Sequence, residues 1–265
     1  MKAVRAILFD VDGTLAETER DGHRVAFNRA FQEAGLNWNW TIELYGELLE
    51  IAGGKERIQH YVKHYQPSFP ADTDLVEFAA NLHRAKSQHY QTLLTQGEIR
   101  LRPGVRRLIQ EAREAGVRLA IATTSALENV LPLLEQALEP GSAEWFEVIA
   151  AGDIVAAKKP APDIYEYALR QMQLDPQDCV AIEDSQQGLR AARGAGLPTI
   201  VTRNDYTRNH DFQDATLVVS TLGDVDNPFT VYRGDAQDAQ FVDLALIHAV
   251  LEASPARELA VGSVG

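Results

Sequence analysis

Two aspartates one residue apart, Asp10 and Asp12, have the clearest potential for chemistry in this sequence. They end an apolar run from Val4 to Phe9, which is typical of a strand buried on both faces of a parallel sheet. Residues two apart on an extended chain point the same way, so the two carboxylates could share one site. Such a pair favours a bound cation such as Mg²⁺ or a shared proton, and either carboxyl could serve as a nucleophile or a general acid.

Two other interpretations of this stretch stay open. Asp12, Gly13 and Thr14 would also suit the N-terminal cap of a helix. A calcium loop of the EF-hand type fits less well, because it needs a third acidic residue before its glycine and Gly13 follows Asp12 directly. The choice therefore depends on the chemistry found elsewhere in the chain.

Polar residues also follow three later stretches that have the composition of buried strands. They are Thr123, Thr124 and Ser125 after 117–122, Lys158 and Lys159 after 147–150, and Glu183 and Asp184 after 179–182. Taken singly, each group has a simpler explanation: Thr123 and Ser125 are more often ordinary loop residues, a pair of lysines is usually solvated surface, and Glu183-Asp184 could cap the following helix. The carboxyl ends of parallel strands meet at one edge of a sheet, so we expect these groups to converge with the two aspartates. Acids suit Mg²⁺, and lysine and hydroxyls suit phosphate oxygens, which together indicate phosphoryl transfer.

The order of the expected elements predicts an α/β fold class: a Rossmann-like parallel sheet core with an inserted all-helical cap domain. The core is expected at 1–16 and 94–225, the cap at 17–93 and a C-terminal extension at 226–265. Cap helices are expected at about 20–34, 41–51, 55–65 and 72–94. Core helices are expected at 105–115, 128–138, 162–172 and 187–195, with later strands at 199–201 and 216–219 and a last helix at 241–251. Pro132 fits its helix only within the first turn.

Composition narrows the possible partners and location. The chain has 265 residues and a net charge of −13, which argues against nucleic acid or an anionic membrane as a partner. The single Cys179 cannot form an internal disulfide, which fits a reducing compartment. No apolar run reaches the roughly 18 residues of a membrane helix, and no signal peptide precedes the first strand. We expect a cytoplasmic protein, or a protein of the plastid stroma if a transit peptide has been removed.

The strand-end residues resemble the motifs of a known family. Asp10-Val11-Asp12-Gly13-Thr14, Thr123, Lys159-Pro160 and Glu183-Asp184 resemble the four motifs of the haloacid dehalogenase-like hydrolase superfamily, over the chain up to about residue 222. Segments 159–165 and 182–188 resemble its β-phosphoglucomutase-like branch, which carries a helical cap just after the first motif. Cap segments 17–24, 35–40 and 51–58 resemble the CbbY group of photosynthetic organisms. That group consists of phosphatases that destroy xylulose-1,5-bisphosphate, an inhibitor of Rubisco in the Calvin cycle of carbon fixation.

The resemblance implies a covalent mechanism with a metal cofactor. Asp10 would attack the substrate phosphorus to form an aspartyl phosphate. Asp12 would protonate the leaving sugar oxygen and then deprotonate the attacking water. Mg²⁺ would be held by the Asp10 carboxylate, the Asp12 main-chain carbonyl and Asp184, with Glu183 reaching it through water.

The same resemblance implies phosphate-binding roles for other residues. Lys159 would offset the charge of the nucleophile and the phosphoryl group, with Lys158 as the second candidate. Thr123 and the Thr124 amide would bind phosphoryl oxygens. Lys55 and Arg57 are the candidates for a distant second phosphate, since arginine suits bidentate phosphate contacts. In the cap, Glu17 is the candidate for sugar hydroxyls, and His23 lies near it in sequence.

The predicted function is a Mg²⁺-dependent sugar-phosphate phosphatase, with xylulose-1,5-bisphosphate as the expected substrate. A sugar-phosphate mutase of the β-phosphoglucomutase type and a phosphatase for another sugar phosphate are the alternatives within the superfamily. A catalytically silent binding module is the alternative of a different class, and the intact motif set argues against it. The expected partner is a small sugar phosphate, without nucleic acid or membrane. The link to Rubisco would run through its inhibitor and not through direct binding.

Overall fold

The structure is a computed structural model that describes residues 3–51, 53–65, 67–68 and 73–253. The chain divides into two compact units. The core unit contains Met1–Leu15, Leu101–Val130 and Gly141–Gly265, and the cap unit contains Ala16–Arg100 and Leu131–Pro140. Of the predicted C-terminal extension at 226–265, the described residues 226–253 group with the core unit, and the predicted domain bounds stay predictions.

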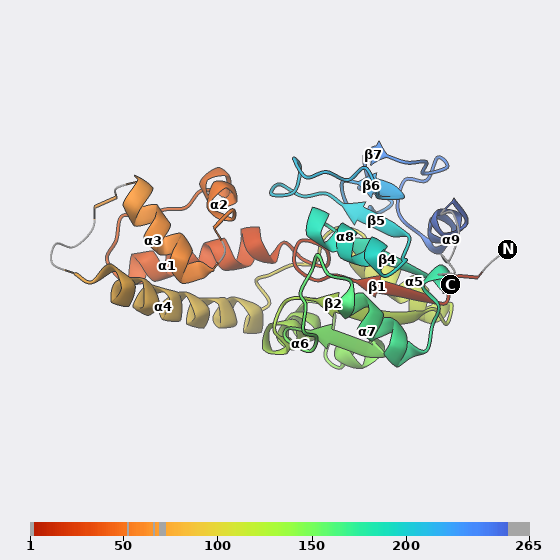
Figure 1. Cartoon of the computed structure of the whole chain (residues 1–265), viewed down its shortest axis with the longest axis horizontal. Coiled ribbons are helices and arrows are strands. Elements are labelled where there is room, and N and C mark those ends of the chain that lie inside the picture. The colour runs from red at the N-terminus through yellow and green to blue at the C-terminus, as the bar shows by residue number, and fades with distance from the viewer. Residues whose placement is uncertain (1–2, 52, 66, 69–72, 254–265) are drawn as a thin grey trace, which may run out of the picture. The chain divides into compact units, whose positions relative to one another are not determined.

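The described part of the core unit is built on one seven-stranded sheet with the order β3-β2-β1-β4-β5-β6-β7 (Figure 1). The strands are β1 (Ala6–Phe9), β2 (Arg118–Thr123), β3 (Val148–Ala151), β4 (Cys179–Glu183), β5 (Thr199–Thr202), β6 (Leu217–Val219) and β7 (Val231–Arg233). Neighbours pair in parallel except β6 and β7, which are antiparallel. The predicted α/β fold class is confirmed.

The register of the central strands decides which residues meet. Phe9 of β1 is level with Ile121 of β2 on one side and with Ile182 of β4 on the other. The residues that follow each strand therefore emerge side by side at one edge of the sheet. All residues of β1 and β4 are buried, as their apolar composition predicted.

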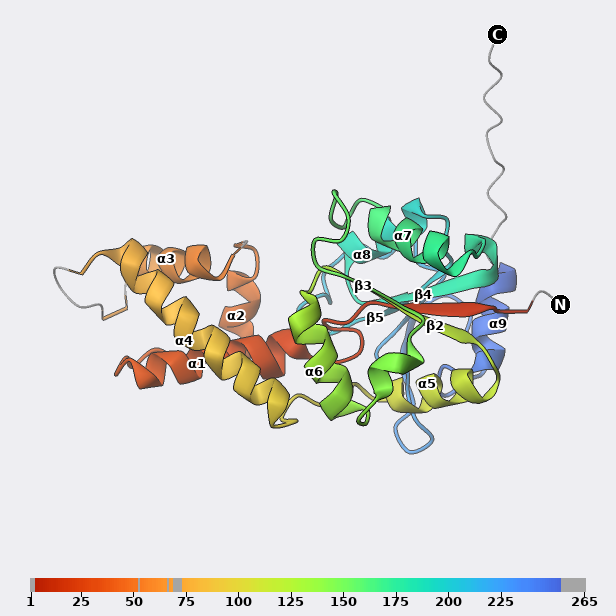
Figure 2. The same cartoon turned by 90° about the horizontal axis from the view of Figure 1, so that it is seen from below.

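Helices cover both faces of this sheet. The core helices are α5 (Val105–Glu114), α6 (Leu127–Ala137, which crosses into the cap unit), α7 (Asp163–Met172), α8 (Gln186–Gly194) and α9 (Leu244–Ala253). Figure 2 shows α7 and α8 on one side of the sheet and α5 on the other. On the α7 and α8 side, one buried cluster includes alanines of neighbouring strands, such as Ala6, Ala120 and Ala122. These small side chains let the helices approach the sheet closely, and this packing fixes the strands that present the polar edge.

The cap unit is helical, as predicted, and packs around aromatic side chains. A π-helix (Thr18–His23) precedes α1 (Arg24–Glu33), α2 (Ile42–Leu48), α3 (Gly54–Tyr65) and α4 (Leu75–Thr95). Trp40 is fully buried, and its ring centroid lies 4.7 Å from that of Phe27 and 4.9 Å from that of Phe31. The Thr41 side chain caps α2 by accepting a bond from the Leu44 amide at 3.2 Å.

Three local features differ from the predictions or lie outside the described residues. Pro132 is not in the first turn of its helix but at the sixth position of α6, which spans Leu127–Ala137. Strand β7 was not predicted, since it has three exposed residues and no buried pattern. The predicted start of α4 at residue 72 lies outside the described residues, where α4 is observed from Leu75. None of the helices described here combines the length and apolar content that crossing a bilayer would need.

Candidate active site

Asp10 lies directly after β1, and its carboxylate is paired with a buried lysine. Lys159 Nζ donates to Asp10 Oδ1 at 2.7 Å and to Glu183 Oε1 at 2.6 Å. The three side chains are shielded from solvent, with exposed fractions of 10% for Asp10, 6% for Lys159 and 0% for Glu183. Burial lowers the pKa of Lys159, but the Asp10 and Glu183 carboxylates raise it more, so the pKa ends above its usual value. The amine therefore stays protonated beside Asp10.

Glu183, the last residue of β4, is held from several sides. The Tyr165 hydroxyl on α7 donates to Glu183 Oε1 at 2.6 Å, and the Asp184 amide donates to Oε2 at 3.2 Å. A Cβ at position 188, in the first turn of α8, would collide with the Glu183 carboxylate, so Gly188 makes room for it. Glu183 is thus fixed by packing and hydrogen bonds rather than by sequence neighbours alone.

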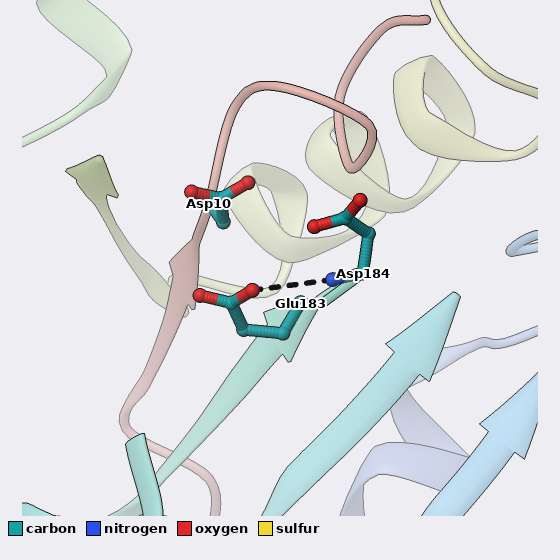
Figure 3. Close-up of side chains that lie close together, drawn as sticks. All are labelled: Asp10, Glu183 and Asp184. Carbon is teal, nitrogen blue, oxygen red and sulfur yellow. Dashed lines mark hydrogen bonds between the residues drawn. The ribbon is translucent and has the colours of Figure 1, made fainter. Parts of the chain in front are cut away.

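Asp10, Glu183 and Asp184 form a cluster of carboxylates (Figure 3). Each can offer one oxygen such that the three oxygens lie within 4.8 Å of one another. Burial raises the pKa of Asp10 to about 7 against the attraction of Lys159, and repulsion from Glu183 and Asp12 adds to the rise. Burial, followed by repulsion from Asp10 and Glu183, raises the pKa of Asp184 well above its usual range. Two carboxyl groups whose ionised forms are disfavoured without a cation, Asp10 and Asp184, lie in this cluster and fit a hard divalent ion such as Mg²⁺.

The turn after Asp10 packs directly against Asp184. Gly13 has a φ of +80°, and a Cβ there would lie 2.6 Å from Asn204 Nδ2 and in collision with the Asp184 carboxylate. Asn204 Nδ2 donates to Asp184 Oδ2 at 2.7 Å. The Arg102 guanidinium donates to the Gly13 carbonyl oxygen. Glycine is required at position 13 because its backbone adopts a left-handed conformation in a space that leaves no room for a side chain.

The predicted hydroxyl donors lie after β2. Thr123 is fully buried, and its Oγ1 accepts a bond from the Ser125 amide at 3.2 Å. The Ser125 hydroxyl donates to Asp12 Oδ2. Asp12 is half-buried and Thr124 is exposed. The loop after β2 therefore meets the turn after β1 at Asp12, while the phosphate-binding roles of Thr123 and Thr124 stay predictions.

The two lysine candidates are separated by their surroundings. Lys159 is buried against Asp10. Lys158 is exposed and pairs with the exposed Asp153 at 2.8 Å. The structure thus brings Lys159 to the predicted nucleophile, and it gives Lys158 a place on the surface.

The four cap candidates lie in different surroundings within the cap unit. Lys55 is exposed at the start of α3, and Glu17 is half-buried just before the π-helix. His23 is half-buried, and its ring stacks on Tyr90 with centroids 3.8 Å apart. Arg57 is buried and donates to the carbonyl oxygens of residues 48 and 51 and to the hydroxyl of residue 45. These bonds make Arg57 part of the internal packing of the cap, so a phosphate contact by Arg57 would require some of them to break.

Sequence reasoning missed four residues that the structure places in or near polar clusters. Tyr165 and Asn204 donate to carboxylates of the cluster, and Arg102 donates to the carbonyl oxygen of Gly13 in the turn after Asp10. Lys86 lies buried in the cap with its Nζ 2.8 Å from His23 Nδ1. Sequence signals could have indicated two of these four residues. Asn204 follows a predicted strand, as the motif residues do, and Lys86 occupies the buried stripe of α4 that otherwise holds apolar residues.

Comparison with known proteins identifies the class. A family model described as haloacid dehalogenase-like hydrolase matches residues 4–196. The chain belongs to this hydrolase family, and the predicted enzyme class, a phosphoric monoester hydrolase, is confirmed.

The similar proteins include the CbbY group, as the cap segments predicted. Protein CbbY of Cereibacter sphaeroides is 49% identical over 222 residues, covering 84% of this chain and 94% of the relative. A crystal structure of CbbY from Rhodobacter sphaeroides in complex with phosphate has a TM-score of 0.66 and 50% identity, and covers 82% of this chain and 94% of its own. An aspartate-to-asparagine variant of CbbY from the same organism, in complex with xylulose-(1,5)bisphosphate, has 48% identity and a TM-score of 0.66, and covers 84% and 98% of the two chains.

Proposed function

We propose that this chain is a Mg²⁺-dependent sugar-phosphate phosphatase whose substrate is xylulose-1,5-bisphosphate. The observation that supports the substrate most directly is the likeness, over 84% of this chain, to a protein crystallised with that bisphosphate. The pairing of Asp10 with Lys159 and the adjoining cluster of acids support the reaction type. If the substrate inhibits Rubisco, the enzyme acts on carbon fixation by removing the inhibitor, with no need to bind Rubisco.

In the proposed reaction Asp10 attacks phosphorus and forms an aspartyl phosphate, while the bond from phosphorus to the sugar oxygen breaks. Asp12 gives its proton to that oxygen, so the sugar leaves as an alcohol. Water then attacks the aspartyl phosphate, Asp12 takes a proton from this water, and inorganic phosphate leaves with Asp10 restored. The Ser125 hydroxyl orients the Asp12 carboxylate between its two roles.

The metal-binding residues in this proposal are Asp10, the Asp12 main-chain carbonyl and Asp184, with Glu183 acting through water. When bound, Mg²⁺ supplies positive charge that offsets the phosphoryl oxygens beside a cluster of carboxylates. Lys159 adds a second positive charge next to Asp10, and its hydrogen bond keeps the Asp10 carboxylate in place. Catalysis of this kind is mainly positioning and charge neutralisation.

The cap residues are proposed to select the sugar and the second phosphate. Of the predicted pair Lys55 and Arg57, Lys55 is the exposed cation. A second, buried cation is Lys86 beside His23, with its Nζ 5.1 Å from the centre of the Tyr90 ring. A phosphate would be attracted strongly to a buried ammonium group, because the low dielectric of the protein interior weakens the attraction between charges less than water does. Glu17 stays the candidate for sugar hydroxyls.

The test is a phosphate-release screen over sugar mono- and bisphosphates with and without Mg²⁺. We expect the highest kcat/KM for xylulose-1,5-bisphosphate, loss of activity in EDTA, and no turnover by Asp10→Asn. A higher kcat/KM for another sugar phosphate would contradict the substrate, and retained activity in Asp10→Asn would contradict the mechanism. Conversion of β-glucose 1-phosphate to an isomer without phosphate release would favour the mutase alternative.

A second test separates the cap cations. Lys55→Ala should raise KM for a bisphosphate far more than for the corresponding monophosphate, because only the bisphosphate has a second phosphate that Lys55 would contact. Lys63→Ala, an exposed lysine on the same helix, is the matched control and should change neither KM. Equal effects of Lys55→Ala on both substrates would contradict its role.

A further inference from the structure

Two side chains outside the four family motifs donate hydrogen bonds to the turn that follows Asp10. Asn204 follows β5 and Arg102 precedes α5, so neither is a neighbour in sequence of the residues it contacts. Both donate to the same acceptor, the Gly13 carbonyl oxygen: Arg102 through Nη1, and Asn204 through Nδ2 at the longer distance of 3.5 Å. The Gly13 peptide is thus held from two directions.

Asn204 also holds Asp184. Its Nδ2 donates to Asp184 Oδ2 at 2.7 Å, which restricts rotation of that carboxylate. The amide itself is fixed, because Asn204 Oδ1 accepts bonds from the Tyr206 amide at 2.9 Å and the Thr207 amide at 3.1 Å. The NH₂ group can therefore point in one direction only, toward Asp184 and Gly13.

Arg102 is a rigid support for the same region. Only 5% of the residue is exposed, and its guanidinium donates to the carbonyl oxygens of Thr202, Arg203 and Ser220 at 2.8 to 3.0 Å as well as to Gly13. Thr202 is the last residue of β5, and the other two acceptors follow directly after β5 and β6. The loop that carries Asn204 is consequently tied to the Asp10–Gly13 turn by one buried side chain.

We propose that Asn204 is a positioning residue for the metal site: it aligns the Asp184 carboxylate with the turn that carries Asp10, and Arg102 holds the loop from which it acts. The inference rests on the proposed Mg²⁺ site. Asn204 contacts none of the reacting atoms, so its effect is expected in metal affinity before chemistry. Partners that orient metal ligands typically change metal affinity by about 10- to 100-fold when they are removed.

The test measures Mg²⁺ binding to metal-free protein by calorimetry, without substrate. Asn204→Ala should weaken Mg²⁺ binding by about 10- to 100-fold. In assays its apparent KM for Mg²⁺ should rise, while kcat at saturating Mg²⁺ stays close to that of the unchanged protein. Asp211→Ala is the matched control, because the exposed Asp211 accepts a similar turn bond from the Gln213 amide at 3.0 Å and is not part of the carboxylate cluster. It should bind Mg²⁺ as the unchanged protein does.

A second variant keeps the test decisive if Asn204→Ala does not fold. Asn204→Asp retains the oxygen that accepts the two turn amides but replaces the donor with an oxygen that faces Asp184 Oδ2. The metal-free Asn204→Asp variant should melt at a lower temperature than the unchanged protein, because the two carboxylates repel each other. Mg²⁺ should raise the Tm of this variant by a larger amount, because the cation offsets that repulsion. Equal Mg²⁺ affinity for Asn204→Ala, or an unchanged Tm and Mg²⁺ response for Asn204→Asp, would overturn the inference. Failure of the unchanged protein to bind Mg²⁺ would overturn the proposed metal site along with it.

Discussion

Replacing Asp10 with asparagine is expected to abolish turnover and yet make the metal-free protein more stable at pH 8. Asparagine has nearly the shape of a protonated aspartate but cannot ionise. In the metal-free protein the Asp10 carboxylate is buried and faces Glu183 and Asp12, and these unfavourable effects outweigh its pairing with Lys159. The neutral side chain removes this cost and leaves Lys159 paired with Glu183.

The magnitude follows from the pKa of Asp10. In the folded protein it is about 7, against an ordinary value of 3.8. That difference corresponds to about 4 kcal/mol of free energy against the ionised form. Because the folded state binds more protons than the unfolded state between these two pKa values, the free energy of unfolding falls as the pH rises from about 4 to 7. The advantage of Asp10→Asn should be complete at pH 8 and about half as large at pH 5.5.

The assay is thermal unfolding in EDTA at pH 8 and pH 5.5, repeated with excess Mg²⁺. For a chain of this length, about 4 kcal/mol corresponds to a rise in Tm on the order of 10 °C. Mg²⁺ should narrow the difference, since it stabilises the protein with the ionised Asp10 more than the variant. Asp153→Asn, at an exposed aspartate, is the matched control and should shift Tm little at either pH.

The outcome that refutes this reasoning is simple to recognise. If Asp10→Asn in EDTA at pH 8 melts at or below the temperature of the unchanged protein, ionisation of Asp10 does not destabilise the folded state. A gain that is larger at pH 5.5 than at pH 8 would reverse the sign of the proton linkage and count equally against it.

Three further outcomes are expected. Lys159→Met should reduce kcat by several orders of magnitude, whereas Lys158→Met should leave steady-state kinetics near those of the unchanged protein, because only Lys159 lies against the nucleophile. Gly13→Ala should lower Tm through backbone strain of about 1–3 kcal/mol and, by displacing Asp184, should weaken Mg²⁺ binding measured by calorimetry; an unchanged affinity would contradict the packing described. Arg57→Ala should destabilise the cap unit, seen as faster limited proteolysis with equal KM changes for mono- and bisphosphates. A selective rise in KM for the bisphosphate would instead restore Arg57 as a phosphate ligand.

The predictability of the elements depended on how local their causes are. The run before Asp10 is apolar enough to be recognised as a buried strand without any knowledge of its neighbours. Strand β7 could not be recognised, because its three exposed residues are extended through antiparallel pairing with β6 and not through their own pattern. The place of Pro132 was not predictable either, because proline disfavours helix interiors, where it removes one backbone donor, and yet it lies inside α6.

The candidate site shows the same division. Most motif residues were predictable because they lie at the carboxyl end of a strand or just after it, where the chain leaves the sheet, whereas Lys159 comes eight residues after β3. The roles of Lys158 and Lys159 were not separable, since adjacent lysines have the same chemistry and only packing buries one of them. Arg57 could be named from its type, but its direction into the cap depends on acceptors in another helix and turn.

The sequence by itself indicated which residues could react: two aspartates after an apolar strand, together with a lysine and two acids that come later in the chain, predict a phosphoryl-transfer site. The tertiary structure decided which of these residues meet and what supports them. The parallel register of β1 and β4 places Asp10 beside Glu183, and packing brings Arg102 and Asn204 onto Gly13 from distant parts of the chain. The physical reason is that strand and turn patterns record the local conformation of the chain, whereas contacts between distant residues depend on register and burial that form only when the whole unit folds.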